Sequence, residues 1–222
     1  MKTVFALSLL PLSASLAFAD DVAERRATCT PLVTAIYDAC EVVNHFSCPD
    51  GGVFAETLSP DLPLRVSLFN SAYQMEYDYT PSNGRGAFHV IETFDPFEMD
   101  LLLSNGTETE SLQRYAIGFF GDESYVVDSR YVLTGDQRAF SVGDMRVIEF
   151  TQQQIVGYAG NAAIAAGHVY LDESLGRYFL GAVTVSFNGA EIVLPNLIDI
   201  VGPASPFFMT QNPEDTCQDP LS

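Results

Sequence analysis

The chain has 222 residues and a formal net charge of −19, because 29 acidic side chains face only ten lysine and arginine side chains. Lys2 is the only lysine. Nucleic acid is therefore excluded as a partner, since phosphate contacts require clustered basic side chains, and binding to an anionic membrane surface is disfavoured for the same reason. The absence of lysine beyond residue 2 also excludes Schiff-base chemistry and a Walker-type phosphate loop.

Residues 1–19 have the layout of a cleavable secretory signal. Lys2 is followed by an apolar run that reaches Leu12, and small residues then lead to Ala19. The apolar run is too short to span a bilayer. We expect cleavage after Ala19, a secreted or periplasmic location, and a single domain in residues 20–222. These residues hold no apolar stretch long enough for a transmembrane helix.

Four cysteines in an exported chain predict two disulfides. Residues 31–44 have a pattern typical of a helix, and this pattern narrows the three possible pairings. Thr30 is a suitable N-cap, and Pro31 suits the first helical position. Apolar residues then recur at helical spacing, at positions 32, 33, 36, 39, 40 and 43.

Such a helix would separate Cys29 from Cys40 by about 16 Å, whereas a disulfide needs Cα atoms within about 7 Å of each other. The sequence therefore predicts the pairs Cys40–Cys48 and Cys29–Cys217. This interpretation makes the segment from Cys40 to Cys48 a structural staple rather than a metal or redox site, and it makes His45 a partner of the helix dipole.

Beyond residue 62 the pattern changes to a period of two. Residues 64–68 and 73–79 alternate apolar and polar side chains with a change of phase near Asn70, which predicts two strands separated by a bulge or turn. Turn sequences such as Gly135-Asp136 then recur, and no helical segments alternate with the strands. The pattern predicts a mainly β fold, a single antiparallel β-barrel or β-sandwich domain with one N-terminal helix.

The clearest local prediction is a hairpin centred on Asn188-Gly189, which suits a two-residue type I′ turn. Its register pairs Phe187 with Ala190 and Val185 with Ile192. By contrast, residues 157–169 are rich in glycine and alanine and leave two alternatives open. They form either a kinked strand that another backbone approaches closely or a short helix over the mouth of a barrel.

Glu76 and Asp78 are the candidate catalytic residues, because they share one face of a predicted strand about 7 Å apart. Two carboxylates at this spacing suit glycoside hydrolysis, in which one is protonated and the other ionised. The segment resembles the Glu-x-Asp-x-Glu strand of some jelly-roll glycosidases, although Thr80 stands in place of the final glutamate. The alternative is the solvated face of an amphipathic strand.

Four carboxylates surround the turn at Pro96, namely Glu92, Asp95, Glu98 and Asp100. Hard carboxylate oxygens at a turn suit calcium, which makes these four residues the candidate metal ligands. Their spacing matches no EF-hand loop, and the alternative is a solvated acidic turn. No other cofactor is predicted.

Three further features carry weaker signals. Ser141 lies in a segment that resembles the nucleophile turn of serine hydrolases, but Ala139 replaces the first glycine and no strand–turn–helix pattern follows. The three histidines at positions 45, 89 and 168 are too far apart in sequence for a local metal motif. Asn105-Gly106-Thr107 is an acceptor sequence for N-glycosylation in a cell that performs this modification.

These observations lead to three functional hypotheses. We expect an exported, acidic, non-enzymatic β-domain that binds a small apolar ligand, a lipid or a partner protein, because the alternating strands are rich in aromatic residues and show no catalytic constellation. One alternative is a carboxylate-dependent hydrolase of the glycoside type that uses Glu76 and Asp78. The other is an outer-membrane-associated barrel, which requires longer strands with an uninterrupted lipid-facing side.

Overall fold

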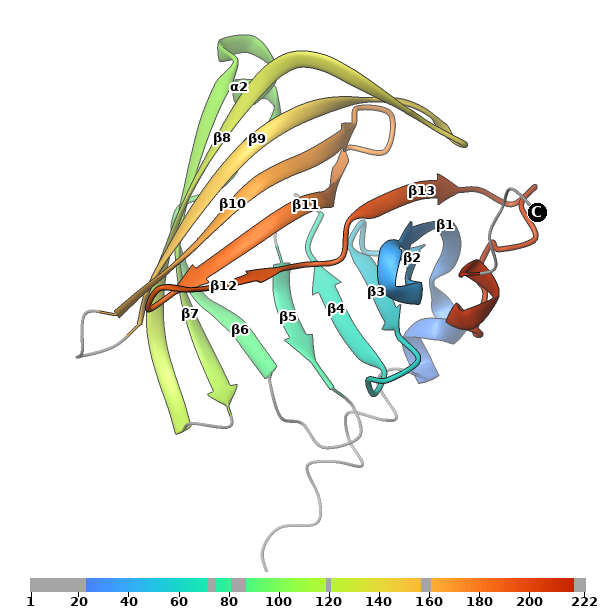
Figure 1. Ribbon diagram of the computed structural model, residues 1–222, viewed down its shortest axis with the longest axis horizontal. Coiled ribbons are helices and arrows are strands. Elements are labelled where there is room, and N and C mark those ends of the chain that lie inside the picture. The colour runs from blue at the N-terminus through green and yellow to red at the C-terminus, as the bar shows by residue number, and fades with distance from the viewer. Residues whose placement is uncertain (1–22, 72–74, 81–86, 119–120, 157–160, 218–222) are drawn as a thin grey trace, which may run out of the picture.

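The computed structural model describes residues 23–71, 75–80, 87–118, 121–156 and 161–217, so the predicted leader at residues 1–19 lies outside the described residues. In these described residues, thirteen antiparallel strands form the body of the protein (Figure 1). Their bounds are β1 Thr30–Tyr37, β2 Glu41–Ser47, β3 Val53–Leu58, β4 Arg65–Phe69, β5 Met75–Tyr79, β6 Ala87–Asp95, β7 Thr107–Gly118, β8 Gly121–Phe140, β9 Gly143–Val156, β10 Asn161–Asp172, β11 Arg177–Phe187, β12 Ala190–Val193 and β13 Leu197–Val201. The mainly β prediction is confirmed.

The strands pair in the order of the sequence from β1 to β12, and β13 returns to pair with β1. In the described residues β5 and β6 share only two residue pairs, Tyr77 with His89 and Asp78 with Phe88. This narrow join separates a half formed by β1–β5 from a half formed by β6–β12. Because β12 and β13 do not pair with each other, the sheet is open and does not close into a barrel.

The predicted helix at residues 31–44 is wrong, because this segment forms the hairpin of β1 and β2. A turn at Asp38–Cys40 joins the two strands, and Ala39 and Cys40 both adopt positive φ there. In β1 every side chain from Val33 to Tyr37 is buried, so both faces of the strand are apolar or enclosed. A strand buried on both faces shows no alternation, and its apolar residues matched a helical spacing by chance.

The predicted disulfide pairing is wrong for the same reason. Since β1 runs antiparallel to β2, Cys29 lies beside Cys48, and their Cα atoms are 4.2 Å apart in the first disulfide. Cys40 in the turn bonds to Cys217, with Cα atoms 5.3 Å apart. The prediction of two disulfides is confirmed, and they indicate a protein that folds in an oxidising, extracytoplasmic compartment.

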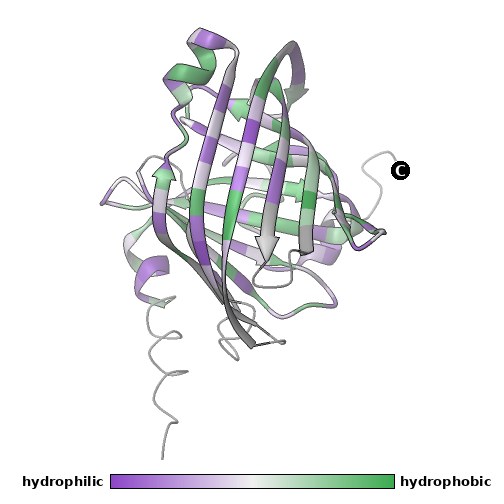
Figure 2. Ribbon diagram, turned by 90° about the vertical axis from the view of Figure 1, so that its left-hand side faces the viewer, coloured by the Kyte–Doolittle hydropathy of each residue, from purple (hydrophilic) through white to green (hydrophobic). Residues whose placement is uncertain are grey.

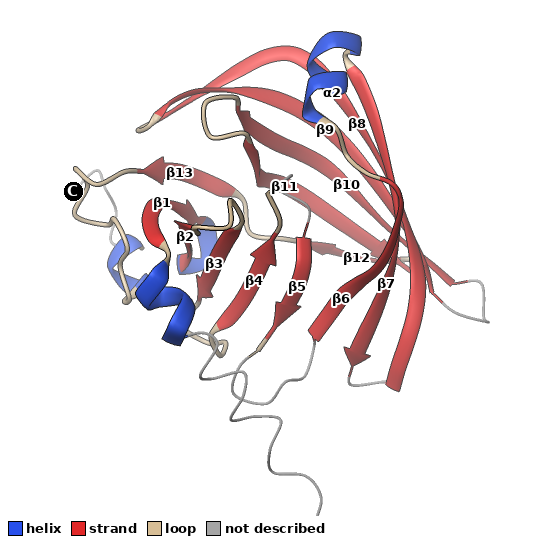
Figure 3. Cartoon of the chain, turned by 180° about the vertical axis from the view of Figure 1, so that it is seen from behind, coloured by secondary structure: helices blue, strands red, loops and turns tan. Residues whose placement is uncertain are grey.

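Both ends of the described chain cover one face of β1–β3 (Figure 3). Thr34, Asn44 and Glu56 are cross-strand neighbours on this face and are fully buried. The Asn44 amide donates to the carbonyl of Thr210 over 2.8 Å, so the C-terminal segment is fixed to the sheet by side chains. From the helical residues 23–28, the Arg26 guanidinium donates to both carboxylate oxygens of Glu56.

Two apolar cores lie on opposite faces of the strands β9–β11. Tyr170 and Phe179 pack with the buried residues of β1 and β13. Their neighbour Leu171, on the other face, packs with Leu102 of the short helix α2, Met99–Asn105. Adjacent residues of a strand point to opposite faces, so β1 and α2 enclose these strands from two sides. Figure 2 shows the alternation of hydropathy along the strands.

The hairpin at Asn188-Gly189 is confirmed, with the predicted register of Phe187 opposite Ala190 and Val185 opposite Ile192. Of residues 157–169, positions 157–160 lie outside the described residues, and from Asn161 the segment belongs to β10, so the helix alternative is wrong. A Cβ at Gly167 would lie 2.1 Å from the carbonyl oxygen of Ala182, which confirms the close approach of another backbone.

The turn predicted at Gly135-Asp136 is instead an irregularity inside the long strand β8. The register between β8 and β9 shifts between Leu133 and Gln137, and Gly135 has a φ of 88°. An insertion of this kind bends a strand without ending it. Among the described residues, no helix is long and apolar enough to cross a membrane.

The disulfide between Cys40 and Cys217 closes a loop with a sequence separation of 177, against 19 for Cys29 and Cys48. Chain entropy then predicts that the double change Cys40→Ser and Cys217→Ser lowers the free energy of unfolding by about 5 kcal/mol, against about 3 kcal/mol for Cys29→Ser and Cys48→Ser. Denaturant unfolding of both variants measures this difference. A non-reducing peptide map that joins Cys40 to Cys48 would contradict the fold of this region.

Candidate functional site

Asp78, one of the two candidate catalytic residues, has a structural ion pair. Its side chain is fully buried, and its carboxylate accepts from Arg65 Nε over 2.7 Å and from Ser67 Oγ over 3.2 Å. The side chain of Glu76 lies outside the described residues. A carboxylate held by a guanidinium in this way is committed to a partner on the neighbouring strand, which weighs against Asp78 as a free acid or base.

The four candidate metal ligands are all exposed around the start of α2. Asp95 accepts a hydrogen bond from Thr109, and Glu98 occupies the N-cap position of α2 without a side-chain cap bond. Glu92 lies in β6, and Asp100 lies in the first turn of α2. The described residues contain no cluster of three or more histidine, cysteine or acidic side chains suited to a metal. The calcium site stays a prediction.

The remaining sequence candidates lie apart from one another. Ser141 Oγ donates to Asp199 Oδ2 over 2.6 Å in an exposed turn, and this contact joins the β8–β9 hairpin to β13. His168 is exposed, with its Nε2 4.0 Å from Glu149. The side chain of His89 is outside the described residues. We find no catalytic arrangement among the described members of this group.

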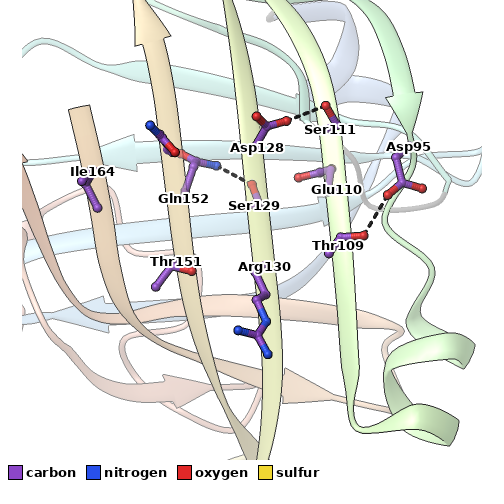
Figure 4. A pocket seen from close by; sticks show the side chains of 11 residues that line it. Asp95, Thr109, Glu110, Ser111, Asp128, Ser129, Arg130, Thr151, Gln152 and Ile164 are labelled. Atoms are coloured by element: carbon purple, nitrogen blue, oxygen red, sulfur yellow. Dashed lines mark hydrogen bonds between the residues drawn. The ribbon is translucent and has the colours of Figure 1, made fainter. Parts of the chain in front are cut away.

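A groove of about 430 Å³ crosses β6–β10 (Figure 4). It is lined by Asp95, Thr109, Glu110, Ser111, Asp128, Ser129, Arg130, Thr151, Gln152, Gln153 and Ile164. Ser111 donates to Asp128 over 2.6 Å, and Thr109 donates to Asp95 over 2.8 Å, so one oxygen of each carboxylate already accepts a hydrogen bond from a neighbouring hydroxyl. Ten of the eleven lining residues are polar, with Ile164 as the exception, although apolar atoms make up most of the exposed wall of the groove.

A polar cluster adjoins this groove, and it is formed by the buried residues Glu110, Arg114, Ser129 and Tyr131 and by the partly buried Tyr178. Tyr131 donates to Glu110 over 3.3 Å, and Ser129 also hydrogen-bonds to the carboxylate. Burial raises the pKa of Glu110, although the charge of Arg114 acts in the opposite direction. Burial likewise raises the pKa of both tyrosines. These groups form an interior network of hydrogen-bond donors and acceptors.

Sequence reasoning missed this cluster, although one signal was present. The alternation in residues 107–112 places Glu110 on the same strand face as Leu112, which is buried. A carboxylate that shares a face with a buried leucine indicates a buried acid. The groove gave no such signal, because its residues come from five strands and meet only through the cross-strand registers of the sheet.

The free edge of β12 is the other distinctive surface. Among the described strands, β12 pairs with β11 alone, and Ile192 and Val193 leave 62% and 72% of their surface exposed. Phe187, at the end of β11, is 43% exposed. Exposed apolar side chains next to unpaired main-chain groups are typical of a strand edge that accepts another strand.

The opposite edge of the sheet, at β13, is covered by the protein itself. Arg138 donates to the carbonyl of Leu197 over 3.0 Å, and the main-chain N–H of Ser141 donates to Asp199 over 2.8 Å. The Arg138 guanidinium also lies 5.0 Å from the ring centroids of Phe140 and Tyr170, which holds it in place. The β8–β9 hairpin thus protects one edge of the sheet.

Comparison with family models, with curated proteins and with solved structures found no match to this chain.

His45 lies outside the groove, and it makes the core between β2 and β11 sensitive to acid. The prediction that His45 lies at the end of a helix is wrong. The residue is buried in β2, and the centroid of its ring lies 5.2 Å from that of Phe179. Burial, with a contribution from nearby Arg177, lowers the pKa of His45 to about 3. The unfolded chain binds a proton near pH 6.5, whereas the folded protein excludes it until about pH 3.

Stability should therefore fall as the pH drops below 6.5, and we expect His45 to account for a loss of about 2 kcal/mol between pH 7 and pH 5. His45→Phe should remove this dependence of the free energy of unfolding on pH. The matched variant His168→Gln, which changes an exposed histidine, should keep it. Urea unfolding at several pH values measures both slopes. Equal slopes in wild type and His45→Phe would contradict the assignment.

Proposed function

We propose that the protein is an exported, non-enzymatic binding domain that captures an extended segment of a partner protein at the free edge of β12. The observation that carries this proposal is the combination of unpaired main-chain groups and exposed apolar side chains on that one strand. The predicted leader at residues 1–19 and the two disulfides support export.

The register of the β11–β12 hairpin determines which main-chain groups of β12 are available. Leu194 donates its N–H to the carbonyl of Val183 over 2.9 Å. In an antiparallel ladder hydrogen-bonded pairs alternate with non-bonded pairs, so Ile192 also points its main-chain groups toward β11. The N–H and C=O groups of Glu191 and Val193 therefore point away from the sheet, where an added strand would pair with them.

The side chains at this edge present apolar surface on both faces of the sheet. Phe187 and Ile192 share one face, and Val193 lies on the other face. Natural edge strands are commonly protected by lysine or proline, and β12 contains neither. An incoming strand would cover these side chains while it satisfies the main-chain groups.

The charge of the protein favours a basic partner. Glu191 is the one charged side chain in β12, and the whole chain carries a formal net charge of −19. A second copy of this chain would bring like charges together, which opposes self-association. We therefore infer an extended segment with alternating apolar side chains and an arginine or lysine that faces Glu191.

The other ligands considered for a binding domain have less support. A small apolar ligand or a lipid requires an enclosed apolar cavity, whereas the groove on β6–β10 is open to solvent and ten of its eleven lining residues are polar. The hydrolase alternative rests on Glu76 and Asp78, and the ion pair of Asp78 with Arg65 weighs against it.

Val193→Pro tests the proposal, because proline removes the outward N–H at residue 193 and leaves the pairing of β12 with β11 intact. The probe is a set of random peptides displayed on phage and selected on the full mature protein. We expect the selected peptides to bind Val193→Pro about tenfold more weakly, and to bind Val193→Thr, which keeps the N–H, like wild type.

Glu191→Gln supplies the electrostatic control, since it should reduce the affinity for basic peptides and the dependence of binding on salt. Peptides that bind Val193→Pro as tightly as wild type, or a selection that yields no binding peptide, would overturn the proposal.

A further inference from the structure

Asn105 occupies an exposed junction between α2 and β7. It is the last residue of α2, and Thr107 is the first residue of β7. Gly106 between them adopts a φ of 75°, and its N–H donates to the carbonyl of Leu102 over 2.8 Å. The acceptor sequence Asn105-Gly106-Thr107 therefore lies in a tight helix-ending turn whose asparagine and threonine side chains are both exposed.

The surface beside Asn105 contains a partly exposed apolar side chain. Leu102 is fully buried and anchors the helix on the sheet, whereas Leu101 is 40% exposed. Residues four positions apart lie on the same face of a helix, so Leu101 and Asn105 are neighbours on the solvent side of α2. A group attached to Asn105 would lie over Leu101.

We propose that Asn105 is N-glycosylated and that the first sugar residue covers Leu101. The disulfides indicate an extracytoplasmic compartment, which is where this modification occurs. The co-reactant is an oligosaccharide carried on a polyprenyl pyrophosphate. A bond forms between the Asn105 amide nitrogen and the anomeric carbon. The bond from that carbon to the pyrophosphate oxygen breaks, the pyrophosphate leaves with the electron pair, and the amide loses one proton.

The position of the glycan is compatible with an open β12 edge. Figures 1 and 3 show α2 and β12 on well-separated parts of the sheet, so a glycan on α2 would leave β12 accessible. The modification does not depend on the proposed partner binding, and either inference can fail alone.

Intact mass spectrometry of the full protein from the cell that naturally exports it tests this site, with and without peptide-N-glycosidase. We expect one glycan, whose enzymatic removal leaves aspartate at position 105. Thr107→Ala and, as an independent variant, Asn105→Gln should both be exported without it.

Ala190→Thr is the matched positive control, because it turns the exposed Asn188-Gly189-Ala190 into a second acceptor sequence in a turn of similar exposure. We expect two glycans in this variant. An unmodified Asn105 in the exported wild-type protein would overturn the proposal, as would a glycan that persists in Asn105→Gln.

Discussion

The return of β13 to β1 is the constraint on which the rest of the structure depends. Twelve strands pair in sequence order, and continued pairing of β13 with β12 would leave β1 as an unprotected edge. Instead the chain passes back across the molecule, and a main-chain hydrogen bond from Asp38 to Asn196 fixes the crossing. The C-terminal segment can then reach β1–β3, and Cys217 meets Cys40. The same return leaves β12 as the last strand of the seven-strand half.

The burial of both faces of β1–β3 follows from the return of β13 to β1. The C-terminal segment and the helical residues 23–28 cover one face of β1–β3, which allows Thr34, Asn44 and Glu56 to be buried with hydrogen-bonding partners. The other face packs on β9–β11, where His45 meets Phe179. The polar face and the apolar face of β1–β3 are thus both enclosed, although the sheet does not close into a barrel. Of the two sheet edges, β13 is covered by the β8–β9 hairpin, whereas β12 is open.

The parts of the fold that the sequence predicts are those with a local physical signal. Asn188-Gly189 predicts its hairpin because both residues tolerate the backbone conformation of a type I′ turn, and the alternation of residues 64–68 predicts β4. The N-terminal hairpin could not be recognised, because burial of both faces of β1 removes the alternation that identifies a strand. The wrong disulfide pairs followed from that error. The groove depends on the registers between five consecutive strands, which no local pattern encodes, and of the polar cluster only Glu110 has a local signal, its alternation with Leu112.

Amide hydrogen exchange of the dilute mature protein, followed residue by residue by NMR, tests the central claim that β12 is a free edge. A free edge gives an alternating result: the amides of Ile192 and Leu194, which point toward β11, exchange slowly, and those of Glu191 and Val193 exchange rapidly. Uniformly slow exchange across residues 191–194 would contradict the account, because it would mean that the edge of β12 is already paired or covered.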